Sequence, residues 1–229
     1  MPHRLQSRLM AGLRPTCDAE EIFDAHVLAC VLAAAAAEVA DGEGDLAAAT
    51  GLDAAMLEAV TDHWFPFTDV EWSFGAPLAA PVPEAEEEML RDLLDAHRRP
   101  SAARGVGATA VASWATAADV GALLARLIAR RAMRPDHLWQ DLGLFDRSEL
   151  NRLLARHFPT LHAGNTSNMK WKKYFYRKLC EAEGFTLCTA PSCAACNDFA
   201  ACFGAEDGES RMAAARRVVD LGTAAIAAE

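Results

Sequence analysis

The chain has 229 residues, of which 52% are hydrophobic and 24% are charged, and its formal net charge at pH 7 is −10. This length and balance are typical of a soluble globular protein with one large domain or two small ones. The acidic net charge disfavours a general nucleic-acid or anionic-membrane binder, so we expect neither nucleic acid nor membrane as a partner.

The N-terminal part of the chain predicts helices. The first seventeen residues contain three arginines and no acid, as transit peptides do, but a frayed terminus is the simpler expectation, and no secretory signal is expected. Residues 19–40 predict a helix with Asp18 as its N-cap. The apolar run within this helix has eleven residues, fewer than the roughly 20 that span a bilayer, so it predicts a buried core helix. Residues 53–64 predict a second, shorter helix.

The middle of the chain predicts a loop, a helix and a boundary. Residues 65–83 hold four of the ten prolines together with several aromatics, which indicates an ordered loop rather than a flexible linker. Residues 84–99 predict an amphipathic helix, because its apolar side chains share one side: Met89, Leu90, Leu93 and Leu94. Helix breakers at 98–109 suggest a division into an N-terminal helical region, 1–108, and a second region, 109–229, packed together as one domain.

The second half predicts further helices and one short connector. The helices are expected at residues 116–133, from Asp146, at 169–183 and from about Ser210, with the connector at 137–144. Asp146 and Glu149 have the spacing of a capping box. Because no convincing two-residue alternation is present, the expected fold class is all-α, a single helical domain that ends in a cysteine-rich loop.

Four cysteines lie within fifteen residues near the end of the chain, spaced C-x4-C-x2-C-x5-C: Cys188, Cys193, Cys196 and Cys202. Thiolates are soft ligands that suit iron–sulfur clusters, zinc and copper(I). We expect a cytoplasmic protein, in which thiols stay reduced and such a group indicates metal binding more often than disulfides. The central C-x2-C pair can present two sulfurs from one turn, and the outer cysteines can complete the ligand set.

The spacing favours an iron–sulfur cluster but leaves zinc, disulfides and inert thiols open. Structural zinc sites are usually made of two close cysteine pairs separated by a longer loop, and only one close pair is present here. A compact, asymmetric run is more common in cluster binding, and C-x4-C-x2-C begins the plant-type ferredoxin pattern. The remaining cysteines, Cys17, Cys30 and Cys180, are interpreted as small buried hydrophobic residues.

Residues 169–204, MKWKKYFYRKLCEAEGFTLCTAPSCAACNDFAACFG, resemble the NifQ family of nitrogen-fixation proteins. The hallmark of that family is the C-x4-C-x2-C-x5-C motif after a helix that contains Trp-Lys-Lys and aromatics. The upstream segments HLWQDLGL and ELNRLLARHFPTLHAGN also look like this family, so the resemblance runs from about residue 130 to about 210. The first half of the chain is less specific.

The resemblance implies a role in metal delivery. NifQ proteins are iron–sulfur proteins that also carry molybdenum, in a cluster of the 4Fe-4S or Mo-3Fe-4S type. They donate molybdenum that began as molybdate for biosynthesis of the nitrogenase iron–molybdenum cofactor, and their expected partners are the nitrogenase iron protein and the cofactor-assembly scaffold. The resemblance assigns the cluster-ligand role to Cys188, Cys193, Cys196 and Cys202, and it indicates a metallochaperone rather than an enzyme.

The segment KWKKYFYRK, residues 170–178, has five bases interleaved with aromatics. One interpretation is an amphipathic helix, whose core stripe contains Trp171, Phe175 and Leu179. The other is a surface that contacts an anion or an acidic partner; its candidate residues are Lys170, Lys172, Lys173 and Arg177. Nearby histidines are candidates for an additional molybdenum ligand, although a lone histidine is more often a hydrogen-bonded structural residue: His137, His157 and His162.

Other functions compatible with a four-cysteine motif are a plain iron–sulfur electron-transfer protein, a structural zinc module and an iron–sulfur DNA glycosylase. Some helical glycosylases end in a C-x6-C-x2-C-x5-C loop and grip DNA with a glycine-rich hairpin, which RGVGATA, residues 104–110, superficially resembles. The first cysteine spacing differs, the hairpin lacks its usual Leu-Pro, and the net charge is unfavourable for binding duplex DNA.

Overall fold

The computed structural model describes residues 2–70, 79–100 and 119–182. In these ranges all regular structure is α-helical and no strand occurs, which confirms the all-α prediction for the part described. The cysteine motif, the helix predicted from Ser210 and the division near residue 108 lie outside these ranges. The helices are α1 Pro2–Ala11, α2 Ala19–Ala40, α3 Leu46–Thr50, α4 Ala54–Trp64, α5 Ala85–Ala96, α7 Val120–Ala132, α8 Leu138–Asp141, α9 Arg147–His157, α10 Pro159–Gly164 and α11 Trp171–Ala182.

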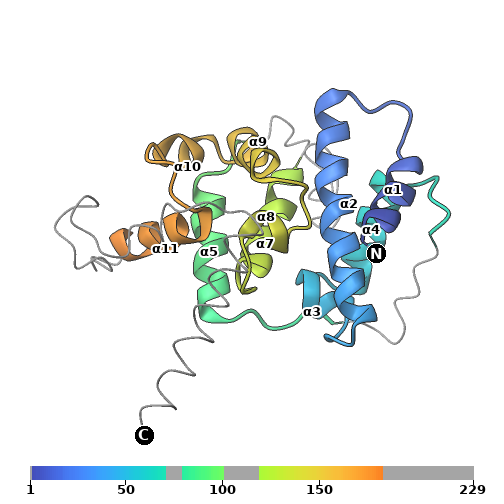
Figure 1. Cartoon of the computed structure of the whole chain (residues 1–229), viewed down its shortest axis with the longest axis horizontal. Helices are drawn as coiled ribbons and strands as arrows, with labels where there is room; N and C mark the ends of the chain where they lie inside the picture. The colour runs from blue at the N-terminus through green and yellow to red at the C-terminus, as the bar shows by residue number, and fades with distance from the viewer. Residues whose placement is uncertain (1, 71–78, 101–118, 183–229) are drawn as a thin grey trace, which may run out of the picture.

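Helix α2 is the long central helix in Figure 1, with α1 and α4 on one side of it and α7 and α8 on the other. It begins as predicted, because Asp18 forms a capping box with Glu21. By length and composition α2 could cross a membrane, but 61% of its most apolar window is buried inside the protein. The prediction of an Ala-rich core helix is therefore confirmed.

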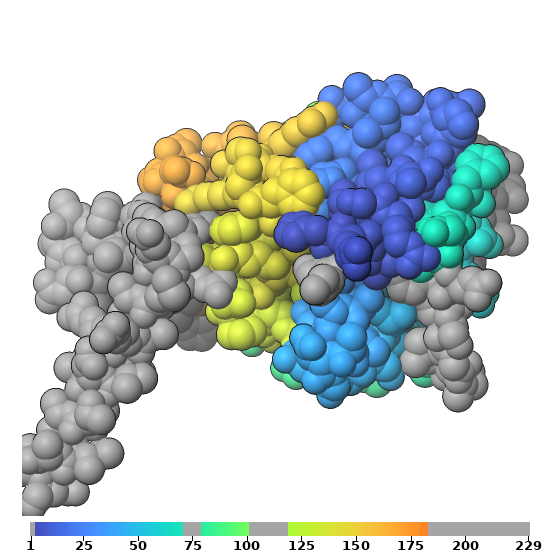
Figure 2. Space-filling model, turned by 45° about the vertical axis from the view of Figure 1, so that its right-hand side comes forward, coloured from blue at the N-terminus to red at the C-terminus, as the bar shows by residue number. Residues whose placement is uncertain are grey.

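Helix α1 corrects the expectation of a frayed N-terminus. It packs along α2, and Leu9 is fully buried in the shared core. The Arg8 Nε donates to Asp69 at 3.0 Å, and the His3 and Phe145 rings lie 5.4 Å apart. Figure 2 shows this dark-blue segment lying against a yellow part of the second half of the chain. A ten-residue amphipathic helix is marginal by itself, so tertiary packing rather than local propensity explains its order.

Helices α5 and α7 pack together and contribute to the same core as α2. Leu90 and Leu94 of α5 are fully buried as predicted, whereas Met89 is 38% exposed. Glu87 is buried beside them because Arg130 of α7 donates to its carboxylate at 2.9 Å. The described part of the predicted loop, residues 65–70 and 79–83, is free of helix and strand.

The capping box predicted at the start of α9 is only half formed. The carboxylate of Asp146 accepts hydrogen bonds from the backbone N–H groups of Ser148 and Glu149, as an N-cap does. The carboxylate of Glu149 does not bond the N–H of the cap residue. It accepts a hydrogen bond from the Phe145 N–H at 2.8 Å and contacts His26 Nε2 at 3.0 Å. Glu149 thus joins α9 to α2 instead of closing the box.

Candidate functional site

Helix α11 leads directly into the cysteine motif, because only residues 183–187 separate its last residue, Ala182, from Cys188. Cys188, Cys193, Cys196 and Cys202 lie outside the described ranges, so their role as metal ligands stays a prediction. The part of the candidate site that the structure describes is α11 together with the residues that hold it.

The apolar face of α11 is anchored in the core. Trp171 is 3% exposed and Phe175 is fully buried, and Leu179 packs partly buried against the same cluster, which confirms the predicted core stripe. The Trp171 indole Nε1 donates to the Asn151 Oδ1 at 2.7 Å, so its polar edge is satisfied on α9. The His162 ring stacks on Trp171 with centroids 5.8 Å apart.

The turn that precedes α11 is held by side-chain hydrogen bonds. Asn165 accepts from the Met169 N–H at 2.8 Å and donates to the Met169 carbonyl at 2.9 Å. Asn168 has φ +53°, a left-handed conformation that asparagine tolerates better than most residues. Arg147 of α9 donates to the carbonyls of Asn168 and Met169 at 3.1 and 2.9 Å. These contacts fix where α11 begins.

The four predicted contact residues, three on α11 and one just before it, are divided between the surface and the interior. Lys173 and Arg177 are exposed and Lys170 is half-buried. Lys172 instead points inward, where its ammonium group binds the Asp141 carboxylate and the Arg134 carbonyl. Of the four predicted contact residues, Lys172 is thus already engaged inside the protein, and the contact role of all four stays a prediction.

Asp141, the partner of Lys172, is 6% exposed. Burial raises the pKa of its carboxyl, because desolvation of the ionised form outweighs the hydrogen bond and the charge of Lys172. Its backbone carbonyl accepts from Arg131 Nε. The pair of Lys172 and Asp141 thus joins α11 to α8.

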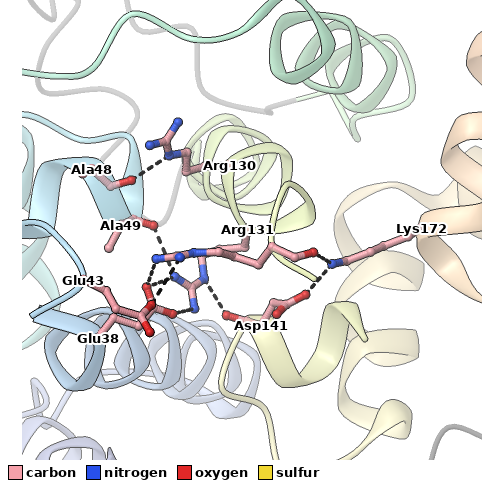
Figure 3. Close-up of polar contacts among 9 residues, drawn as sticks. Glu38, Glu43, Ala48, Ala49, Arg130, Arg131, Asp141 and Lys172 are labelled. Atoms are coloured by element: carbon pink, nitrogen blue, oxygen red, sulfur yellow. Dashed lines mark hydrogen bonds and ion pairs between the residues drawn. The ribbon is translucent and has the colours of Figure 1, made fainter. Parts of the chain in front are cut away.

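A buried charge network continues from Asp141 to α2 (Figure 3). Arg131 is 1% exposed and donates to Glu38 at 2.8 Å and to the Ala49 carbonyl at 3.4 Å. Arg134 also binds Glu38. Burial opposes ionisation of Glu38, but the hydrogen bond and the charge of Arg131, helped by Arg134, lower its pKa below the ordinary value. The network was not predicted, because no sequence pattern links α2, α7 and α11.

The three candidate histidines all lie within the described ranges. His157 Nε2 lies 2.7 Å from the Asp24 carboxylate, His162 stacks on Trp171, and His137 is the N-cap residue of α8. Across residues 2–70, 79–100 and 119–182, no three His, Cys, Asp or Glu side chains come together as a metal site. Their interpretation as molybdenum ligands gains no support from these positions.

The cysteines outside the motif have no disulfide. Cys30 is 2% exposed, and burial, assisted by the charge of Glu149, raises the pKa of its thiol to about 12. Its interpretation as a small buried hydrophobic residue is confirmed. Cys17 and Cys180 are only half-buried, so that interpretation was wrong for their degree of burial.

All regular structure in the described ranges is α-helical, and a C-x4-C-x2-C-x5-C motif follows these ranges in the sequence. These two features define a class of helical proteins with a C-terminal four-cysteine motif. A model of the NifQ family matches residues 27–204, a segment that includes all four motif cysteines. The chain therefore belongs to the NifQ family, whose proteins are involved in nitrogen fixation.

Individual relatives agree with this assignment. The chain is 47% identical over 207 residues to the NifQ homolog of Sinorhizobium fredii, covering 90% of this chain and 83% of the relative. It is 37% identical over 183 residues to protein NifQ of Rhodobacter capsulatus, covering 80% and 91%. A shorter match, 47% identical over 83 residues, relates 36% of it to 43% of protein NifQ of Azotobacter vinelandii. No solved structure matches the chain significantly.

Proposed function

We propose that this protein carries an iron–sulfur cluster on Cys188, Cys193, Cys196 and Cys202 and uses it to receive molybdenum and donate it for biosynthesis of the nitrogenase iron–molybdenum cofactor. The observation that carries the proposal is the family match across residues 27–204, which covers the four-cysteine motif. Molybdenum is the cargo in this proposal, so the protein acts as a metallochaperone and catalyses no turnover of a substrate.

The chemistry of the donor set fits this role. Four thiolates are the usual ligand set of a 4Fe-4S cluster, and sulfur ligands also suit reduced molybdenum. In a mixed Mo-3Fe-4S cluster, three cysteines would hold iron and the fourth would bind or release molybdenum. The chain contributes the thiolates, and the core contacts of Trp171 and Phe175 hold helix α11, which precedes the motif in sequence.

Exposed cations on α11, the helix that precedes the motif in sequence, support a docking role toward acidic partners. The proposed recipients are the nitrogenase iron protein and the cofactor-assembly scaffold, in the cytoplasm. Lys173 and Arg177 lie on the exposed side of α11. Changing both to glutamate should weaken association with the iron protein and make the remaining association less sensitive to salt, since rim charges act mainly through steering. Unchanged association and salt dependence would remove this surface from the proposal.

A series of single serine substitutions tests the ligand assignment. Cys188→Ser, Cys193→Ser, Cys196→Ser and Cys202→Ser would each be purified without oxygen, and iron and molybdenum per chain would be measured. The matched control is Cys17→Ser with Cys180→Ser, which removes two thiols outside the motif. We expect metal loss in the motif variants alone, with one of them losing molybdenum more than iron. Equal loss of both metals in all four would reject the division of roles, and metal loss in the control would reject the ligand assignment.

A further inference from the structure

Helix α1 presents a basic surface on an acidic protein. The first seventeen residues contain Arg4, Arg8 and Arg14 and no acid, although the whole chain has a formal net charge of −10. Leu9 is buried against α2, whereas the side chains of His3, Arg4 and Arg8 are exposed. Figure 2 shows α1, in dark blue, at the surface of the molecule. We call this exposed side of the helix the α1 face.

The contacts of the arginines leave the α1 face positive. Arg8 pairs with Asp69, but the two side chains are 51% and 75% exposed, so this ion pair is weak. Arg14 contacts His63 Nε2 at 3.1 Å, and burial together with the charge of Arg14 lowers the pKa of His63, so this pair carries a single positive charge at pH 7. Arg4 has no acidic partner in the described ranges.

Two exposed aromatic side chains lie at the ends of the α1 face. The ring of Phe145, which is 50% exposed, lies 5.4 Å from His3 at the start of the helix. Phe67, which is 68% exposed, donates its backbone N–H to the Gly12 carbonyl at 3.1 Å, one residue past the end of the helix. A ten-residue helix is about 15 Å long, so the aromatics bracket the arginines. Aromatic residues and arginine are enriched in protein–protein interfaces.

The α1 face is distant from the basic side of α11. In Figure 1, α1 and α11 lie at opposite ends of the described part of the chain, with α2 and α7 between them. Helix α1 packs on α2, whereas α11 packs on α5. A protein bound to the α1 face would therefore leave Lys173 and Arg177 accessible to another partner.

We propose that the α1 face, together with Phe67 and Phe145, docks a second acidic protein while α11 docks the first. Opposite charge steers such a partner to the arginines, and the aromatics supply apolar contact area at both ends. The inference rests on the proposed function for the partner at α11. The α1 face itself lies outside the family match, which begins at residue 27, apart from Phe67 and Phe145 at its edges.

The test uses the full-length protein with two probes, the purified nitrogenase iron protein and the purified cofactor-assembly scaffold, each alone and both together. The key variant combines Arg4→Glu with Phe67→Ser. The matched control combines Arg99→Glu with Val82→Ser, an exposed cation and a 90% exposed apolar side chain beside the two ends of α5. Circular dichroism and thermal unfolding verify that both variants are folded.

We expect the key variant to bind the scaffold about fivefold or more weakly, because truncating an interface aromatic and reversing a steering charge both act there. Its binding should depend less on salt, and its binding of the iron protein should be unchanged. The control should change either affinity by less than about twofold. The unsubstituted protein should form one complex that contains both probes.

Three results would overturn the inference: scaffold binding that the key variant does not weaken, an equal loss in the control, or displacement of one probe by the other. Absence of scaffold binding to the unsubstituted protein would overturn it as well. The metal content of the same preparation tests the proposed function separately, so the two failures can be distinguished.

Discussion

The ammonium group of Lys172 binds the carboxylate of Asp141, and this contact connects the helix before the cysteine motif to the buried centre of the protein. The Asp141 carbonyl accepts from Arg131, and Arg131 binds Glu38 of α2. The position of α11 is thereby coupled to a helix more than a hundred residues earlier in the chain. The predictions below test the contacts that set this arrangement.

Breaking the pair should be costly. Lys172→Met leaves a buried carboxylate without its cation, and Asp141→Asn leaves a mostly buried ammonium without its anion. Each should lower the free energy of unfolding at pH 7 by about 3 kcal/mol, because an unpaired buried charge retains its desolvation cost. Urea denaturation of both single variants and of the double variant measures this. The double variant should lose less than the sum of the single losses.

The pH dependence of Lys172→Met gives a second measure of the same pair. Burial raises the pKa of Asp141 in the folded protein, so the folded state binds the proton more tightly than the unfolded state does. Stability therefore increases as pH falls through the folded pKa toward the unfolded value of about 3.9. The defect of Lys172→Met should shrink as pH falls from 7 into this window. A defect that stays constant would mean that Asp141 is not a buried charge in the variant.

Asp24 should make the protein sensitive to acid. It is 1% exposed and contacts His157 Nε2 at 2.7 Å and Arg156 Nη2 at 2.9 Å. Burial opposes its ionisation, but the hydrogen bonds of His157 and Arg156 outweigh burial and lower its pKa below 3.8. Its contribution to stability is complete above an unfolded pKa of about 3.9 and is lost as pH falls through the folded pKa.

The variant Asp24→Asn isolates this effect. It should lower the free energy of unfolding by about 3 kcal/mol at pH 7, because Arg156 and His157 lose their carboxylate. Its stability should also depend less steeply on pH below about 4 than that of the unsubstituted protein. Some acid sensitivity should persist, since the pKa of Glu38 is lowered too. Equal slopes in the two proteins, measured by urea denaturation, would contradict the role of Asp24.

Gly143 should not tolerate a side chain. Its φ is +69°, and a Cβ atom there would lie 2.6 Å from the Cys30 carbonyl oxygen on α2. Gly143→Ala should cost about 3 kcal/mol, from a left-handed backbone and from overpacking. Gly42→Ala is the matched control, because Gly42 has φ +86° with nothing within 4 Å of an added Cβ. The control should cost about 1 kcal/mol. Similar losses in thermal unfolding would show that contact with α2 is unimportant.

Local signals predicted most of the individual helices but not their connections. Asp18 was predicted as the start of α2 because an N-cap acts within one turn, and the helix predicted over residues 53–64 corresponds to α4. The five residues of α3 were missed, since one turn is too short to show a helical period. The α1 helix was missed because it depends on packing against α2.

In the candidate site, too, the local features could be predicted from the sequence and the contacts between helices could not. Its core stripe on α11 was predicted, because Trp171, Phe175 and Leu179 repeat every four residues. The inward direction of Lys172 was not, because it depends on Asp141, thirty-one residues away, and on the α7–α8 turn. The motif cysteines could be identified as candidate ligands from the sequence, because their spacing is typical of motifs that bind a metal cluster.

Metal content of the full-length protein tests the central proposal most directly. The chain would be produced with molybdate supplied, purified without oxygen, and examined by elemental analysis and by visible and electron paramagnetic resonance spectra of one sample. A molybdenum donor predicts iron together with molybdenum, a brown colour and a cluster signal, all lost when Cys193 and Cys196 become serine. Iron without molybdenum would indicate a plain iron–sulfur protein, and colourless protein containing zinc would contradict the proposal.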